Sequence, residues 1–215
     1  MVFDRIGFDR LIRLRWLDRV ALLAAELRDA DALHRAVLAQ LAGELPGADG
    51  WRKTANVLTR IWWRVPEEHV PLRDEALARI DACTPEERLM YHWGMCLLAY
   101  PLFQDVAATV GRLLRLQGAV RQAQVISRIS AEWGNRSTLE TAVPRIVRSF
   151  VDWGVLAAAA EKGAYRAGAQ IAVACPECAA WLLATLRRSR PVDLPTCELL
   201  HLPELFAFTA LSRPI

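Results

Sequence analysis

The apolar residues of this chain recur mainly at helical spacing. From Phe8 to Leu45 they form two successive stripes, which predict a pair of helices that ends at Pro46-Gly47. A capping box, Thr84-Pro85-Glu86-Glu87, predicts another helix start, because the threonine hydroxyl and the glutamate satisfy each other's backbone amides. Including the helix that starts there, further helices are predicted over 51–65, 74–82, 85–100 and 103–116. These helices predict a compact helical domain over residues 1–118.

A different pattern begins at Gln122. Two short helices, 122–133 and a second starting at Ser137, are joined by Gly134-Asn135-Arg136, which is short enough to turn the chain sharply. The second helix is introduced by a capping box, Ser137-Thr138-Leu139-Glu140, with an apolar stripe behind it. Two predicted strands, 155–160 and 165–173, then flank Glu161-Lys162-Gly163. This order predicts a winged helix-turn-helix with a small β-hairpin wing.

Pro144 conflicts with a regular second helix. Proline lacks the backbone donor and costs about 3 kcal/mol in a helix interior. Two alternatives follow: the helix is kinked at Pro144, or it starts later with Thr141 as its cap. The later start would shift the polar stripe of the helix and weaken the case for a helix that reads a DNA groove.

The C-terminal part is predicted to be a helix followed by an apolar tail. The expected organisation is a helical domain over 1–118, a winged-helix domain over 119–173, and a helix with a tail over 174–215. The tail contains prolines spaced among leucines and phenylalanines. It is too apolar to remain exposed to solvent and should pack back on the body. The expected fold class is therefore mainly α, and no Gly/Ser-rich linker separates the parts.

Composition sets limits on the class of protein. The chain has 215 residues, of which 53% are hydrophobic, so it can bury a large core. It contains no window of 18 uncharged apolar residues and no apolar signal-peptide core, so we expect a soluble, cytoplasmic protein that does not bind a membrane. Its five cysteines are then expected to be reduced thiols.

The distribution of charge favours a DNA-binding role for the predicted winged helix. The net charge is only +3, but the stretch from Gly111 to Phe150 contains seven arginines and only two glutamates. Side chains at the start of the second helix and on its polar stripe are predicted to enter or border the major groove of double-stranded DNA: Ser137, Thr138, Thr141, Arg145 and Arg148. Arginines around the first helix are predicted to hold phosphates: Arg121, Arg128 and Arg136. Lys162 and Arg166 are predicted to serve the wing.

The cysteines and histidines have two interpretations. Cys175, Cys178, Cys197 and His201 have spacings that zinc sites use, but Pro176 and Glu177 are also residues that begin a helix. We favour the structural interpretation, with neither zinc nor redox chemistry. His92 lies beside tryptophan and methionine in an apolar helix, so we interpret it as a core residue.

No catalytic signature is present. The chain lacks a Gly-rich phosphate loop, a G-x-S-x-G elbow and an H-E-x-x-H motif, so we expect a non-enzymatic protein with no cofactor and no small-molecule substrate. The alternative function is protein interaction, in which the winged helix docks a partner and a tryptophan such as Trp63 acts as an anchor.

The order of a helical N-terminal region, 51–118, and a basic winged helix, 124–156, resembles the BrxA family of the BREX phage-exclusion systems. The resemblance covers about two thirds of the chain and is one of organisation rather than of a signature motif. It implies a non-enzymatic, DNA-binding component of a multi-protein bacterial defence system. It also implies an N-terminal domain similar to the helical antitermination factor NusB. Pro144 and the cysteine-bearing tail depart from that pattern.

Overall fold

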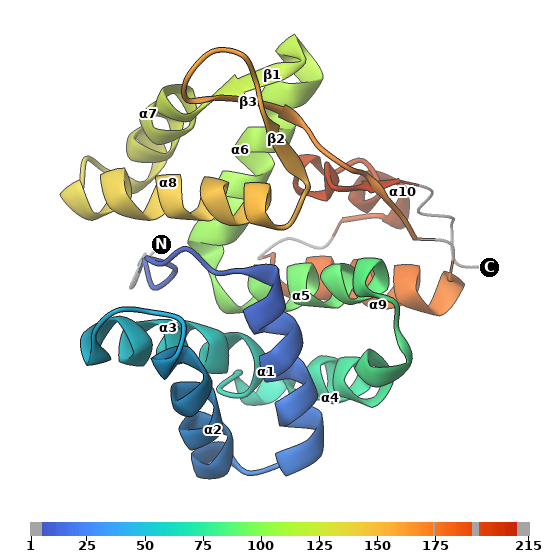
Figure 1. Cartoon of the computed structure of the whole chain (residues 1–215). Coiled ribbons are helices and arrows are strands. Elements are labelled where there is room, and N and C mark those ends of the chain that lie inside the picture. Colours follow the sequence, from blue (N-terminus) through green and yellow to red (C-terminus); the bar gives the residue numbers. More distant parts are fainter. Residues whose placement is uncertain (1–5, 174, 191–193, 210–215) are drawn as a thin grey trace.

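The computed structural model describes residues 6–173, 175–190 and 194–209, and the protein is mainly helical with a small antiparallel sheet (Figure 1). The helices that precede the sheet are α1 (Leu14–Leu27), α2 (Ala30–Ala42), α3 (Ala48–Trp62), α4 (Val70–Arg79), α5 (Pro85–Ala99) and α6 (Pro101–Gln117). Two short 3-10 turns flank α4: η1 (Glu67–His69) and η2 (Ile80–Ala82).

The sequence determines where α5 and α6 begin and end. Thr84 accepts from the Glu87 amide at 3.3 Å, and the Glu87 carboxylate accepts from the Thr84 amide at 2.9 Å, which confirms the predicted capping box. Pro101 then begins α6 at its first turn, where a missing backbone donor costs nothing. The chain turns at Tyr100, which lies between the two helices. Residues 89–99, which make up most of α5, are buried.

The second half of the chain contains a three-stranded sheet whose strands come before and after one pair of helices. After α6 come β1 (Ala119–Arg121), α7 (Gln122–Trp133), α8 (Ser137–Asp152), β2 (Leu156–Ala158) and β3 (Ala164–Ala167). The strands are antiparallel in the order β1-β3-β2. Val120 pairs with Tyr165, and Tyr165 pairs in turn with Ala158. The central strand thus joins the residues just before α7 to those just after α8.

The tail packs on the body. Its elements are β4 (Ile171–Ala172), α9 (Pro176–Arg188), α10 (Thr196–Leu199), η3 (Pro203–Leu205) and β5 (Phe208–Thr209), and β4 pairs with β5 in parallel. The turn η3 lies directly on α6 at Gly111, where a Cβ atom would come within 1.9 Å of the Pro203 carbonyl oxygen. Only glycine allows the two backbones to approach this closely.

An aromatic cluster at the centre unites the three parts of the chain. Trp93 of α5 is fully buried and stacks on Phe150 of α8 with ring centroids 5.0 Å apart. Phe206 and Phe208 of the tail meet the same tryptophan at 5.4 and 5.7 Å. Its indole Nε1 donates to the Glu204 carbonyl at 3.1 Å, so the polar atom of this buried ring is satisfied.

The residues before α1 run between the N-terminal helices and α8 (Figure 1). We call residues 6–13 the N-terminal segment. Phe8 in this segment is fully buried against Tyr100 and Phe103. The amide of Ile12 donates to the Ser149 hydroxyl of α8 at 2.9 Å, and the indole Nε1 of Trp153 donates to the Ile12 carbonyl at 2.9 Å. The N-terminal segment therefore anchors the C-terminal half of α8.

Three sequence-based expectations about this region need correction. The capping box at Ser137 is wrong, because Arg136 takes the extended capping conformation and no side chain caps α8. The later start at Thr141 is also wrong, since α8 begins at Ser137 and contains Pro144 within it. The second predicted strand, 165–173, was too long, because the chain leaves the sheet after Ala167 and pairs with the tail from Ile171. In the described ranges, no helix has both the length and the apolar character needed to cross a bilayer.

Candidate nucleic-acid interface

The N-terminal half of α8 presents hydroxyl groups to solvent. Leu139, Ala142 and Val143 face the core, whereas Ser137, Thr138 and Thr141 are exposed. The exposed stripe continues along the helix through Arg148, which has no hydrogen-bond or ion-pair partner among the described residues. This half of α8 projects beyond the N-terminal helices in Figure 1. The surface of this half is open, and farther along the same stripe Arg148 is unpaired among the described residues.

Arg145 differs from the other predicted groove residues. It is half-buried, and its guanidinium donates to the carbonyl oxygen of Asp9 in the N-terminal segment. Two neighbours on the same side of α8 bind the same region: Ser149 accepts from Ile12, and Asp152 accepts from the Leu14 amide at 2.8 Å. In this structure Arg145 therefore belongs to the joint between α8 and the N-terminal segment rather than to the exposed stripe.

The wing loop, residues 159–163, carries an ion pair at its base. Arg121 donates to the Glu161 carboxylate at 2.8 Å, and both side chains are 60% exposed. The bound guanidinium holds the pKa of Glu161 below its usual value. Lys162 at the tip and Arg166 on β3 are exposed and unpaired within the described ranges. Arg121 thus contacts a carboxylate that a phosphate would have to displace.

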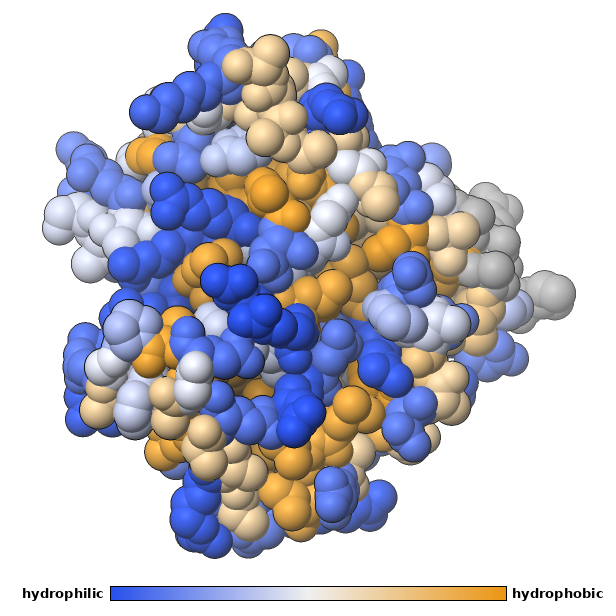
Figure 2. Space-filling model, in the orientation of Figure 1, coloured by the Kyte–Doolittle hydropathy of each residue, from blue (hydrophilic) through white to orange (hydrophobic). Residues whose placement is uncertain are grey.

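The remaining predicted phosphate contacts lie on and after α7. Arg128 is exposed on α7 and has no partner in the described part of the chain. Arg136 is exposed at the start of α8 and, unlike Arg128, has an interaction partner. Figure 2 shows mostly hydrophilic side chains over α7 and the outer part of α8. The structure therefore places the predicted residues on two exposed parts of one unit, the wing with α7 and the stripe of α8, with Arg145 turned away from both.

The net positive charge of the chain lies in this unit, because acidic residues are sparse there. Between Pro101 and Val173 there are nine basic and five acidic side chains, a net charge of +4, against +3 for the whole chain. The remainder of the protein is therefore slightly acidic. A local positive field on an otherwise neutral protein is typical of a surface that attracts a polyanion.

The four residues with zinc-like spacing are not brought together. Cys175 caps the start of α9, while Arg187 near the other end of α9 donates to Thr196, the neighbour of Cys197, at 2.6 Å. A helix of 13 residues is about 20 Å long, so Cys175 and Cys197 lie far apart. In the described ranges no group of three such ligands gathers. Contact with the Cys178 side chain raises the pKa of the Cys175 thiol to about 11, which disfavours the reactive thiolate.

His92 lies in the core, as its sequence context suggested. It is fully buried, its ring packs edge-on against Trp62 at 5.3 Å, and burial lowers its pKa. Its partner is Asp18, whose carboxylate lies 2.9 Å from Nε2; this contact could not be predicted from local patterns, because the two residues are 74 positions apart in the chain. The contact with Asp18 orients a fully buried ring, so we interpret the pair as a structural contact.

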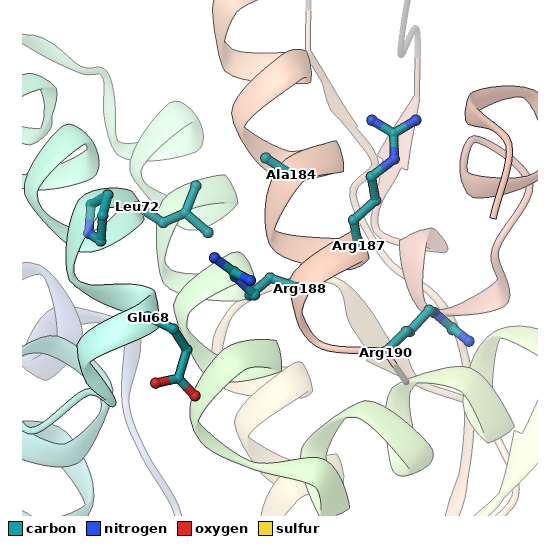
Figure 3. A pocket seen from close by; sticks show the side chains of 7 residues that line it. Glu68, Leu72, Ala184, Arg187, Arg188 and Arg190 are labelled. Carbon is teal, nitrogen blue, oxygen red and sulfur yellow. The ribbon is translucent and has the colours of Figure 1, made fainter. Parts of the chain in front are cut away.

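A cavity of about 510 Å³ lies between α4 and the end of α9, and several arginines line it. Figure 3 shows that these arginines do not converge: Arg188 points across toward α4, whereas Arg187 and Arg190 point toward the tail. Arg187 binds Thr196, and Arg190 pairs with the buried carboxylate of Glu204. The cavity therefore has no set of cations aimed at one ligand.

Sequence reasoning missed the groups that hold the basic side chains in place. β1, Glu161 as the partner of Arg121, and Asp9 as the acceptor for Arg145 all act across separations of about 40 residues or more. Periodicity reports only which face of one element is apolar, so it contains no signal for such pairs.

No family model, curated protein or solved structure matches the chain.

Proposed function

We propose that the protein is a non-enzymatic, double-stranded DNA-binding protein and that α6 to β3 form a winged helix. The proposal rests on one observation. A unit with the element order α6-β1-α7-α8-β2-β3 and the strand order β1-β3-β2 carries the basic excess of the chain. In a helix-turn-helix the second helix enters the major groove with its N-terminal residues. Here that half of α8 is the exposed half.

The roles follow from exposure and pairing. Thr138 and Thr141 would face base edges, where hydroxyl groups accept or donate according to the base. Arg148 and Arg128 would neutralise phosphates on either side of the groove, and Lys162 would do so from the wing. Arg145 would act indirectly, by fixing α8 to the N-terminal segment.

Salt dependence and charge reversal test the proposal together. A labelled random duplex is titrated with the protein at about 50 and about 200 mM salt. Three phosphate contacts would weaken binding about sixfold for each doubling of the salt concentration. We expect Arg148→Glu to weaken binding about equally for all duplex sequences and to reduce the salt slope by about 1.

Arg35→Glu is the matched control, because Arg35 is exposed on α2 and the substitution changes the net charge equally. Equal affinities for the two variants, or no duplex binding by the wild type, would refute the proposal. Reversal of Arg145 is a poor test because it also breaks the contact with Asp9.

The second candidate is a protein-docking role for the same unit. Leu116, at the end of α6 beside β1, is 77% exposed and is a large apolar side chain with no cover. Docking through Leu116 would show little salt dependence and would be lost in Leu116→Ser, whereas duplex binding would be unaffected by that change. A role in phage exclusion follows from the resemblance in organisation, and loss of protection in cells carrying Arg148→Glu would test it.

A further inference from the structure

A pocket lies between α1 and α4, and none of its lining residues belongs to the proposed winged helix. Its volume is about 390 Å³. We call it the α1–α4 pocket; its lining residues are Ala24, Ala25, Arg28, Trp63, Arg73, Asp74 and Leu77. Figure 2 shows apolar side chains at the surface where α1 and α4 adjoin. The pocket is thus an opening in an apolar surface that is bordered by charged groups.

One side of the pocket is a rigid aromatic and cationic wall. The Arg73 guanidinium lies 5.1 Å above the Trp63 ring and donates to the Trp63 carbonyl at 3.2 Å. Its other edge binds the Asp74 carboxylate at 2.7 Å, so the positive charge of Arg73 is largely neutralised. The side chain of Arg73 is only 14% exposed. This wall provides shape and an aromatic face but little net charge.

Arg28 supplies the free charge. It follows α1 in the left-handed conformation, with φ 49° and ψ 24°, and is the one described non-glycine residue with positive φ. Glycine normally takes this position after a helix, and another residue there costs about 1–2 kcal/mol. Arg28 is exposed and has no hydrogen-bond or ion-pair partner among the described residues. Arg28 thus lines the pocket with a side chain that no described group pairs.

The surrounding acids limit the ligand to a single negative charge. Glu26, Asp29 and Asp31 are exposed and close to Arg28 in the chain. They repel every anion, but they repel a nucleic acid or a polyphosphate more strongly than a single carboxylate, because the repulsion grows with the charge of the ligand while only one guanidinium, that of Arg28, is available to pair with it. The floor of Ala24 and Ala25 is small and apolar and leaves room for a hydrocarbon group.

We propose that the α1–α4 pocket binds a monocarboxylate with an apolar body, which pairs with Arg28 and packs on Trp63. Two sources share this chemistry: a free hydrophobic acid, and the C-terminal residue of a peptide with an apolar side chain. The proposal is independent of DNA binding, because the two surfaces have no residue in common.

Two pairs of probes test the ligand class by nuclear magnetic resonance. The indole cross-peak of Trp63 is assigned by its absence in Trp63→Phe. Octanoate is compared with 1-octanol, and N-acetyl-leucine with N-acetyl-leucinamide, so each pair differs mainly in the carboxylate. We expect at least one acid to shift the Trp63 signal saturably and to bind about tenfold or more tightly than its neutral counterpart.

The variant Arg28→Gly separates binding from folding. Glycine suits the left-handed position, so the variant should fold at least as well as the wild type, yet bind the acid no better than the neutral probe. Arg28→Lys should retain part of the affinity. A preference for octanoate indicates a free acid, and a preference for N-acetyl-leucine indicates a chain terminus.

Equal binding of the acid and neutral probes, undiminished binding in Arg28→Gly, or no saturable shift of the Trp63 signal would each overturn the proposal. A Trp63 shift on adding duplex DNA would also overturn it, because it would assign the pocket to a polyanion.

Discussion

Substitution of Gly111 by alanine tests whether the tail lies on α6 as described. An added Cβ would meet the Pro203 carbonyl oxygen at 1.9 Å and its carbon at 2.7 Å, and both are backbone atoms that cannot rotate away. Alanine is intrinsically better than glycine in a helix by about 0.5–1 kcal/mol. Overpacking a close backbone contact costs about 1–3 kcal/mol, so the sum is expected to be destabilising.

Gly50→Ala is the matched control for this change. Gly50 lies within α3, and its Cβ would meet nothing within 4 Å, so only the helix-propensity gain should remain. The two variants should therefore differ by the steric cost alone, about 1–3 kcal/mol. At about 2–4 °C per kcal/mol for a protein of this size, their melting temperatures should lie about 2–12 °C apart, with Gly50→Ala the higher.

Thermal and urea unfolding followed by circular dichroism provide the measurement. If both variants were stabilised equally, η3 would not rest on α6 at this position. The packing of Phe206 and Phe208 on Trp93 would then also be in doubt, because η3 leads directly into these residues.

Three further predictions follow from single contacts. Glu161→Gln should strengthen duplex binding, because it frees Arg121 from its carboxylate partner, and a filter or anisotropy titration showing weaker binding would contradict this. Ser149→Ala should lower the free energy of unfolding by about 1–3 kcal/mol in urea titrations, because it leaves the buried Ile12 amide without an acceptor, and an unchanged midpoint would refute that hydrogen bond. Burial lowers the pKa of His92, so the unfolded chain binds a proton before the folded one does. The contribution of His92 to stability is thus complete above its unfolded pKa of 6.5 and is lost as the pH falls, and the urea midpoint should decline less in His92→Gln than in the wild type between about pH 7.5 and about pH 5.5.

Local sequence signals predicted the helices well, because a capping box or a proline acts only on the residues next to it. The capping box at Thr84 gave the correct start of α5, and Pro101 marked its end, although α6 begins at Pro101 itself and not at the predicted residue 103. Ser137 shows the limit of this reasoning. Arg136 took the capping conformation in its place, and the motif alone did not distinguish the two positions.

The candidate DNA surface was only partly predictable. Helical periodicity gave the exposed stripe of α8 through Thr141 and Arg148, because exposure follows from the position of the apolar face. The same periodicity placed Arg145 on that stripe, although the N-terminal segment binds its side chain. Contacts between residues 136 or more positions apart depend on the whole fold, and the pattern of one helix does not contain them.

The joint between the N-terminal segment and α8 also affects the order in which the chain can fold during synthesis. Phe8 and Ile12 leave the ribosome early, but Ser149 and Trp153, which satisfy the Ile12 backbone, are made about 140 residues later. At about 5–20 residues per second, this apolar stretch waits for several seconds or more without its partners. The N-terminal segment therefore completes the fold late, although it is made before every helix that it contacts.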